Sequence, residues 1–309
     1  MSPTPMNHAI KIYANHLADL RYSPTTCERY LRVLREFQEY LAATCPATTL
    51  DAVNRDTVVL FLRQSNAGSA SSQNVRLAAL RGFFGFLRRQ GMLPSNPAEQ
   101  VEFLSVKTTE PTFLSMSEYG RLLRVLRRHS FPALIARNEA IIVVLFNTGL
   151  RVSELAALTL DMCDFSTRAF RSVPLKGGDF GSVEWNSETE RVLKAWLAER
   201  KDCRVEADEH ALFVSTRGTR LSVRAIQDFF KRVSTIARVR KRVTPHVLRH
   251  SMATEMLRHG VDIRTIADLL HHASLNTTRR YAHVVDSLRR KALASLEPKR
   301  KPPRERPRR

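Results

Sequence analysis

The stretch at residues 244–257 reads TPHVLRHSMATEML, and the start of this stretch carries the chemistry. Thr244 followed by Pro245 predicts a helix N-cap and a proline at the first helical position. His246 and Arg249 are three residues apart, so they share one face of the first turn. A helix N-terminus that also presents a histidine and an arginine is suited to bind a phosphate. An isolated H-x-x-R pattern is weak evidence, so the rest of the chain has to support it.

Four further residues of related chemistry lie on either side of this helix. Arg151 follows a buried helix that we predict over residues 137–148, and Lys176 lies in a glycine-flanked turn. His272 and Tyr281 are nine residues apart across a polar turn. Each of them alone has an ordinary interpretation as a surface, capping or half-buried residue. Together, two arginines, a lysine, two histidines and a tyrosine fit attack on a phosphodiester without a metal ion.

These residue types divide the work of cutting a phosphodiester. Arginine forks hold the charge that grows on the non-bridging oxygens during in-line displacement. A tyrosine, with an unperturbed pKa of about 10, needs cations and a base to become a nucleophile at neutral pH. A lysine or a histidine can give the departing 5′ oxygen its proton. The chain has no G-x-x-x-x-G-K-[ST] loop and no evident three-carboxylate cluster, so we expect no cofactor, no metal and no ATP.

The charge balance indicates a polyanionic partner. The 309 residues include 50 Lys+Arg and 30 Asp+Glu, a formal charge of +20. Residues 289–309 hold ten basic and two acidic residues, and without them the chain still carries +12. Neutralising phosphates releases counterions and drives association with nucleic acid, although a solubilising charge excess is the alternative.

Cysteine usage and hydropathy bear on the compartment. The four cysteines form no C-x-x-C pair, which favours reduced thiols in a cytosol. The longest uninterrupted apolar run, 140–146, is far shorter than the roughly 20 residues that span a bilayer. We therefore expect no membrane partner and a cytoplasmic, nucleoid-associated protein.

The hydrophobic periodicity predicts a mainly α protein with two domains. The first is a four-helix domain, and the second is an α+β domain that is mostly helical with a small antiparallel sheet. The boundaries that we expect are 1–100 for the first domain, 101–112 for a linker, 113–297 for the second domain and 298–309 for a basic disordered tail. The sheet is expected over residues 164–184, as a β-hairpin or three strands.

Local signals in the second domain set further element boundaries. Capping boxes at Ser115/Glu118 and Ser187/Glu190 predict two helix starts. A short strand is expected over 212–214, and a helix over 222–239.

Three long blocks resemble the tyrosine recombinases of the phage-integrase family, most closely the Xer-type recombinases. The blocks are NTGLRVSELAALTL (147–160), TPHVLRHSMATEML (244–257) and LLHHASLNTTRRYAHV (269–284). Their order and spacing match the family, and the helical N-terminal domain resembles the family's core-binding domain. The resemblance implies a site-specific DNA recombinase or integrase. Such an enzyme cleaves and rejoins DNA through a 3′-phosphotyrosyl intermediate, without metal or ATP.

The resemblance also implies a role for each candidate residue. The catalytic set is Arg151, Lys176, His246, Arg249, His272 and the nucleophile Tyr281. The arginines clamp the scissile phosphate, His246 is the acid/base, His272 hydrogen-bonds the phosphate, and Lys176 is the general acid to the 5′ oxygen. Glu154 is expected to orient the basic residues, and His250 to support the site from behind.

Two departures from the family pattern concern this set. The family's hairpin usually reads G-K-G with further basic residues, whereas this chain has PLKGGDFGSVEW, which leaves the register around Lys176 open. His271-His272 stands where the family usually has Gly-His. Counting nine residues back from Tyr281 selects His272, so His271 is expected to be a supporting or solvent-facing residue.

Double-stranded DNA is the partner that this interpretation implies, clamped between the two domains. An arginine-rich stretch is expected to contact its backbone, through Arg238, Arg240, Lys241 and Arg242. Recombination joins two duplexes with two active sites each, which implies a homo-tetramer on two DNA sites. A related recombinase or an accessory protein remains open as a further partner.

Three alternatives to recombination stay open at this point. A non-cleaving helical DNA-binding regulator would use the 222–239 stretch and the helices after it as a helix-turn-helix. A type IB topoisomerase shares the chemistry but does not require two DNA sites. A zinc hydrolase would use four histidines, namely His246, His250, His271 and His272.

Overall fold

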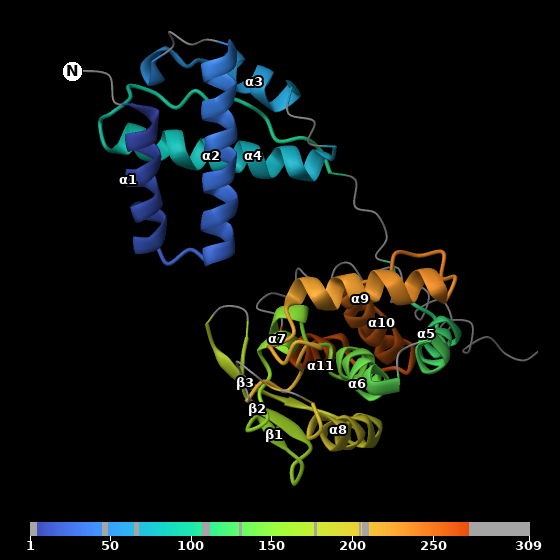
Figure 1. Ribbon diagram of the computed structural model, residues 1–309. Helices are drawn as coiled ribbons and strands as arrows, with labels where there is room; N and C mark the ends of the chain where they lie inside the picture. Colours follow the sequence, from blue (N-terminus) through green and yellow to red (C-terminus); the bar gives the residue numbers. More distant parts are fainter. Residues whose placement is uncertain are drawn as a thin grey trace, which may run out of the picture. The chain divides into compact units, whose positions relative to one another are not determined.

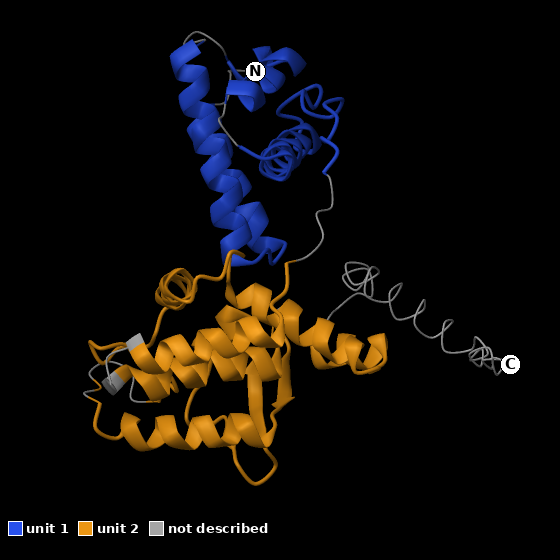
Figure 2. Ribbon diagram, turned by 90° about the vertical axis from the view of Figure 1, so that its right-hand side faces the viewer, with its two compact units in different colours: residues 1–109 blue, residues 110–309 orange. Residues whose placement is uncertain are grey.

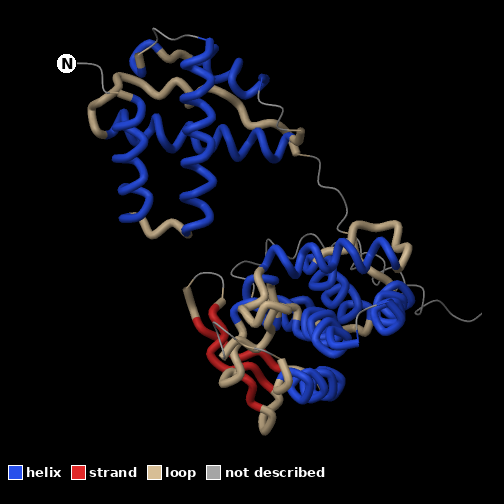
Figure 3. Tube along the Cα trace, viewed as in Figure 1, coloured by secondary structure: helices blue, strands red, loops and turns tan. Residues whose placement is uncertain are grey.

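The computed structural model of the chain describes residues 5–44, 49–64, 68–106, 112–129, 132–175, 178–203, 205 and 210–271. The chain forms two compact units, residues 1–109 and 110–309 (Figure 2). Helices predominate, and the described strands all belong to unit 2 (Figure 3), so the mainly α class is confirmed. Among the described residues, no helix has both the length and the apolar character needed to cross a membrane. Lys176, His272, Tyr281 and the tail predicted at 298–309 lie outside the described residues.

Unit 1 is the helical domain that the sequence predicts. Its elements are α1 (Met6–Asp19), α2 (Pro24–Thr44), the short 3-10 helix η1 (Leu50–Ala52), α3 (Arg55–Gln64) and α4 (Ala70–Arg89) (Figure 1). Helices α1 and α2 contact each other, and α1, α2 and α3 each contact α4. Phe37, Phe83 and Phe84 are fully buried in the shared core. The N-cap expected before α2 is present, since Ser23 Oγ accepts from the Thr26 N–H at 3.2 Å.

The first part of the predicted linker packs on unit 1. The Asn74 side chain in α4 donates to the Leu104 carbonyl and accepts from the Leu104 N–H, both at 2.8 Å. The Arg81 guanidinium lies 4.5 Å from the centre of the Phe103 ring and donates from Nε to the Ala98 carbonyl at 3.0 Å. The packed structure of unit 1 therefore continues through Leu104.

Unit 2 is built around one buried helix. Its helices are α5 (Met116–His129), α6 (Pro132–Thr148), α7 (Val152–Ala157), α8 (Ser187–Arg200), α9 (Val223–Ile236), α10 (Pro245–Arg258) and α11 (Ile263–Leu269). Helix α6 contacts α5, α8 and α10, and its residues 140–145 are almost wholly inaccessible to solvent. This burial explains why the sequence of α6 is apolar on every face rather than on one stripe.

A small antiparallel sheet lies at one edge of unit 2 (Figure 1). Strands β1 (Cys163–Asp164), β2 (Ala169–Pro174) and β3 (Phe180–Glu184) are ordered β1-β2-β3. Pro174 pairs with Phe180 across the β2–β3 hairpin. The Leu175 N–H donates to the Asp179 carbonyl at 2.8 Å and closes the turn. The sheet predicted over 164–184 is thus confirmed in its three-stranded form.

Three local expectations were wrong. The N-cap of α8 is Asn186 rather than Ser187, since its amide oxygen accepts from the Thr189 N–H at 3.0 Å. The strand predicted over 212–214 forms only an isolated bridge, from Val214 to Arg220. Side chains occupy two of its three carbonyls: Trp196 Nε1 donates to the Leu212 oxygen at 2.8 Å, and Arg137 Nη1 donates to the Val214 oxygen at 2.9 Å. Helix α9 ends at Ile236, three residues before the predicted end.

Candidate active site

Helix α10 begins as the sequence predicts. Thr244 Oγ1 accepts from the Val247 N–H at 3.2 Å, and Pro245 occupies the first turn. His246 is exposed, whereas Arg249 is only 4 % exposed. The two residues on this face therefore differ in their surroundings: the imidazole is open to solvent, and the guanidinium is enclosed by protein.

Arg249 joins three segments that are far apart in the sequence. Its Nη1 donates to the carbonyl of Gly149, which follows α6, and its Nη2 donates to the carbonyl of Leu270, which follows α11. Gly149 has φ +64°, and a Cβ there would lie 2.7 Å from the Met252 sulfur. Only glycine permits both this backbone conformation and this close approach. Arg249 thus fixes the end of α6 and the end of α11 against α10.

Arg151 stands two residues after Gly149, at the N-cap of α7. Glu154 Oε1 accepts from Arg151 Nη1 at 2.7 Å, and its Oε2 accepts from the Arg151 N–H at 2.6 Å. The Glu154 side chain is 3 % exposed and that of Arg151 is 26 % exposed. A buried carboxylate that binds both the backbone and the guanidinium restricts the rotamers of the arginine. This is the orienting position that the resemblance implies for Glu154.

His250 contacts His246 one helical turn away. The two Nε2 atoms are 3.0 Å apart, and the rings meet edge to face with centroids 4.3 Å apart. His250 is buried. Since a hydrogen bond between two imidazoles needs one donor and one acceptor, the tautomers of His246 and His250 are coupled.

A groove of about 760 Å³ opens beside His246. Lys231 and Ser234 of α9 line it, and Arg242 and Thr244 line it from the segment that leads into α10. Val152, the neighbour of Arg151, closes the groove from α7. The groove therefore connects the exposed face of α9 with the start of the arginine-bearing helix α7.

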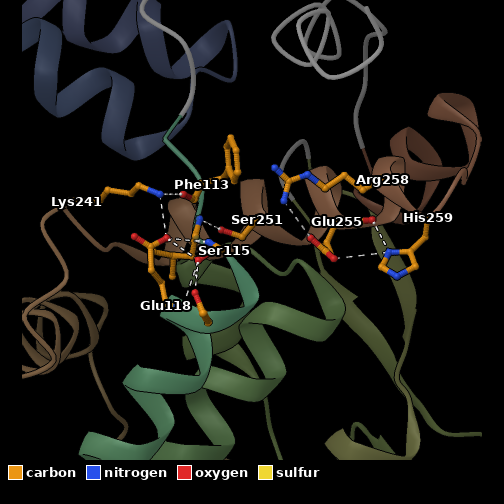
Figure 4. Close-up of polar contacts among 10 residues, drawn as sticks. Phe113, Ser115, Glu118, Lys241, Ser251, Glu255, Arg258 and His259 are labelled. Atoms are coloured by element: carbon orange, nitrogen blue, oxygen red, sulfur yellow. Dashed lines mark hydrogen bonds and ion pairs between the residues drawn. The ribbon is translucent and has the colours of Figure 1, made fainter. Parts of the chain in front are cut away.

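Lys241, predicted to contact DNA, is engaged inside unit 2. Its Nζ donates to the Phe113 carbonyl at 3.0 Å and to Glu118 Oε2 at 2.9 Å (Figure 4). Burial raises the pKa of Glu118, but hydrogen bonds from the Ser115 N–H and Lys241 leave that pKa below its ordinary value. The Leu114 N–H donates to Ser251 Oγ at 2.8 Å. These contacts fix the start of unit 2 on α10.

The other three residues of that predicted surface, Arg238, Arg240 and Arg242, are exposed.

Sequence reasoning missed a second basic groove, of about 200 Å³, between α2 and α4 of unit 1. Arg29, Arg32 and Arg76 line it together with Glu36, which pairs with Arg76 at 2.7 Å. Three arginines against one carboxylate leave this groove positive. Only the spacing of Arg29 and Arg32 could have indicated it, because Arg76 comes from another helix.

Five of the predicted site residues lie among the described residues of unit 2. They are Arg151, Glu154, His246, Arg249 and His250. Lys176, whose place in the sequence is between β2 and β3, lies outside the described residues, and so do His272 and Tyr281. Within the described ranges, no three His, Cys, Asp or Glu side chains gather in an arrangement that could hold a metal ion.

Comparisons with known proteins show the family of this chain. Residues 112–287 match the Phage integrase family, and residues 10–91 match the phage integrase N-terminal SAM-like domain. The chain is 33% identical over 269 residues to tyrosine recombinase XerC of Lacticaseibacillus casei, which covers 85% of this chain and 89% of that protein. It is also 33% identical over 286 residues to XerC of Myxococcus xanthus, with 91% and 94% covered.

The fold is shared with a solved recombinase complex. The crystal structure of the XerH site-specific recombinase bound to a palindromic difH substrate superposes with a TM-score of 0.71 at 24% identity, and covers 87% of this chain and 79% of that one. The family match over residues 112–287, which exceeds half of the sequence, and the XerC relatives at 33% identity show the family. The chain belongs to the phage integrase family of tyrosine recombinases, site-specific enzymes that cleave and rejoin DNA by strand transfer.

Proposed function

We propose that Tyr281 attacks the scissile phosphate of DNA while Arg151 and Arg249 hold its non-bridging oxygens. The observation that carries this proposal is the pair of hydrogen bonds from Arg249 to the Gly149 and Leu270 carbonyls. Gly149 leads into Arg151, and Leu270 leads along the chain towards Tyr281. One guanidinium thus bonds to a residue of the arginine block and to Leu270, the second residue of the block 269–284 that contains Tyr281.

The other tyrosines support the choice of Tyr281 by their positions. The chain has six, and four of them belong to unit 1, whereas both arginine blocks belong to unit 2. Tyr119 of unit 2 is 5 % exposed and stacks on Phe146 with ring centroids 4.1 Å apart. Burial raises its pKa above the ordinary tyrosine value, which disfavours the phenolate that attack requires.

In the proposed reaction the phenolic oxygen of Tyr281 bonds to phosphorus, and the bond from phosphorus to the 5′ oxygen breaks. His246, whose tautomer is coupled to that of His250, takes the phenolic proton. Lys176 gives a proton to the departing 5′ oxygen, and His272 hydrogen-bonds the phosphate. Because the phosphotyrosyl bond conserves the energy of the broken phosphodiester, a 5′ hydroxyl can reverse the step on another strand without ATP.

The proposed substrate is double-stranded DNA. The groove beside His246 carries Lys231 and Arg242, and the groove of unit 1 carries Arg29 and Arg32, so each unit offers cations to phosphates. Structures of similar fold include a lambda integrase dimer bound to a core site. For this chain we propose assembly into a homo-tetramer on two DNA sites in the nucleoid, with a related recombinase or accessory protein as a further partner.

A suicide duplex, nicked so that the cut end diffuses away, tests the nucleophile. Wild-type enzyme is expected to accumulate a covalent protein–DNA adduct, and Tyr281→Phe to bind the same DNA without forming one. Tyr22→Phe, which alters an exposed tyrosine of unit 1, is the matched control and should form the adduct at the wild-type rate. An adduct with Tyr281→Phe would refute the assignment.

The suicide duplex and a supercoiled plasmid together address the alternatives. A non-cleaving DNA-binding regulator would give no adduct even with the wild-type chain, and the family match argues against it. A topoisomerase-like activity would relax supercoiled plasmid that carries a single site, whereas recombination needs two sites.

A further inference from the structure

The segment that leads into α5 is bound to α10 at two levels of the helix (Figure 4). The Leu114 N–H donates to Ser251 Oγ at 2.8 Å, and that hydroxyl in turn donates to the Val247 carbonyl at 2.7 Å. Leu114 and Ser251 are 2 % and 1 % exposed, so this contact is shielded from water. The Arg258 guanidinium lies 4.9 Å from the centre of the Phe113 ring. The segment therefore contacts the middle of α10 and its last residue.

Lys241 binds the same segment at the other end of α10. It stands three residues before Thr244, the N-cap of the helix. Its ammonium donates to the Phe113 carbonyl at 3.0 Å and to Glu118 Oε2 at 2.9 Å, and it lies 5.5 Å from the centre of the Phe113 ring. Glu118 Oε2 also accepts from the Ser115 N–H at 2.8 Å, which caps α5. One ammonium thus joins the chain before α10, the chain before α5 and the first turn of α5.

The charge of Lys241 is directed into unit 2 and not into the groove beside His246. The carboxylate of Glu118 lies within hydrogen-bond distance and balances this charge. Arg242, the next residue along the chain, lines the groove, as does His246. Lys241 does not line it. Two neighbouring basic residues therefore have different surroundings, a groove for Arg242 and the start of α5 for Lys241.

The placement of α10 determines where two residues of the site stand. His246 lies in the first turn, five residues after Lys241, and Arg249 follows it on the same helix. Arg249 is 4 % exposed and donates to the Gly149 and Leu270 carbonyls. A buried side chain with two fixed partners cannot follow a shift of its helix without losing them. A misplacement of about 1 Å can slow a reaction by about 100-fold.

We propose that Lys241 is a positioning residue, which holds the start of α10 on the segment before α5 so that His246 and Arg249 keep their places. It acts through Glu118 and the Phe113 carbonyl and not through a phosphate of DNA. The inference rests on the proposed roles of His246 and Arg249 in cleavage.

Removal of the ammonium from the full-length chain tests this inference. Lys241→Met has a side chain of similar length without charge or donor. This variant is expected to bind the suicide duplex with the wild-type affinity and the wild-type dependence on salt, and to cleave it about 10- to 100-fold more slowly at saturating enzyme. Lys241→Arg keeps the charge and the donors, so it should recover most of the rate. Rates are compared at a temperature at which denaturation curves show every variant to be folded.

Lys194→Met is the matched control. Lys194 of α8 also pairs with a glutamate, Glu190, at 2.7 Å, and its Nζ lies 5.8 Å from the centre of the Phe165 ring. The loss of this pair leaves α10 in place, so the control should cleave at the wild-type rate.

Glu118→Gln tests the same contact from its other side. A glutamine deprives the ammonium of its carboxylate, so this variant should also cleave more slowly than the wild type. Because both substitutions break one contact, the double variant should be no slower than Lys241→Met.

Four results would overturn the positioning role. They are a wild-type rate for Lys241→Met, a Lys241→Arg variant as slow as Lys241→Met, a wild-type rate for Glu118→Gln, and a decrease of about 0.9 in the slope of log affinity against log salt concentration for Lys241→Met, which would assign the ammonium to a phosphate. Arg249→Ala separates these results from failure of the proposed function. If Arg249→Ala itself cleaves at the wild-type rate, the proposed role of Arg249 fails and the inference fails with it.

Discussion

Glu154→Gln is expected to slow DNA cleavage by about 10- to 150-fold with little effect on DNA binding. The Glu154 carboxylate is buried and holds the Arg151 guanidinium at 2.7 Å and the Arg151 N–H at 2.6 Å. The amide of glutamine can accept from one of these donors, but it loses the charge that orients the guanidinium. A hydrogen bond to a charged group contributes about 1.5–3 kcal/mol. At about 1.36 kcal/mol for each tenfold change in rate, loss of that contribution from the transition state gives the range above.

The assay is single-turnover cleavage of the suicide duplex at saturating enzyme, with DNA affinity and the free energy of unfolding measured in parallel. Glu190→Gln is the matched control. Glu190 pairs with Lys194 and Arg168, both at 2.7 Å, on the surface of unit 2. Such pairs contribute about 0–1 kcal/mol, so this variant should cleave at the wild-type rate.

Cleavage by Glu154→Gln at the wild-type rate would refute the reasoning, because Arg151 would then need no carboxylate to hold the phosphate. Equal slowing of the Glu190→Gln control would show that the assay reports folding rather than the site.

Three further predictions concern stability and DNA binding. Arg249→Ala leaves two buried carbonyls without their donor, so urea denaturation should show a loss of about 2–6 kcal/mol in unfolding free energy, and cleavage should fall by at least about 100-fold; wild-type stability would contradict the buried contacts. Hydrogen bonding from Arg127 holds the pKa of Glu139 below its ordinary value, so this interaction stabilises the fold above the unfolded-state pKa of about 4.3, and the stabilisation is lost as pH falls through the folded pKa. Glu139→Gln should therefore show a smaller loss of stability on acidification, and an unchanged acid profile would argue against the pair. Arg32→Ala should reduce the slope of log affinity against log salt concentration by about 0.9 if the groove of unit 1 contacts one phosphate through this residue; an unchanged slope would remove Arg32 from the DNA surface.

The sequence predicted the parts of the fold whose signals are local. Thr244 and Pro245 mark the start of α10, and Ser115 with Glu118 marks the start of α5, because caps depend on neighbours within one turn. Helix α7 was missed, since six residues are too few for a hydrophobic period. The N-cap of α8 is Asn186 and not the predicted Ser187, because either of these adjacent polar side chains can accept from the N–H groups of the first turn.

The contacts that organise the site are non-local, and the sequence could not predict them. Arg249 was identified as a phosphate ligand, but its bond to Gly149 spans 100 residues. Lys241 looked like part of a surface cluster, whereas its partner Glu118 is 123 residues away. His271 was treated as peripheral because no local pattern shows that it lines a cavity together with Ser182 of β3.

The most direct test of the account is to identify the residue that bonds to DNA. Wild-type enzyme trapped on the suicide duplex is digested with protease, and the peptide that carries nucleotide is sequenced by mass spectrometry. We expect a single adduct, a 3′-phosphate on Tyr281, with a 5′ hydroxyl on the released strand. An adduct on Tyr119 or on a tyrosine of unit 1, or linkage through a 5′-phosphate, would contradict the account.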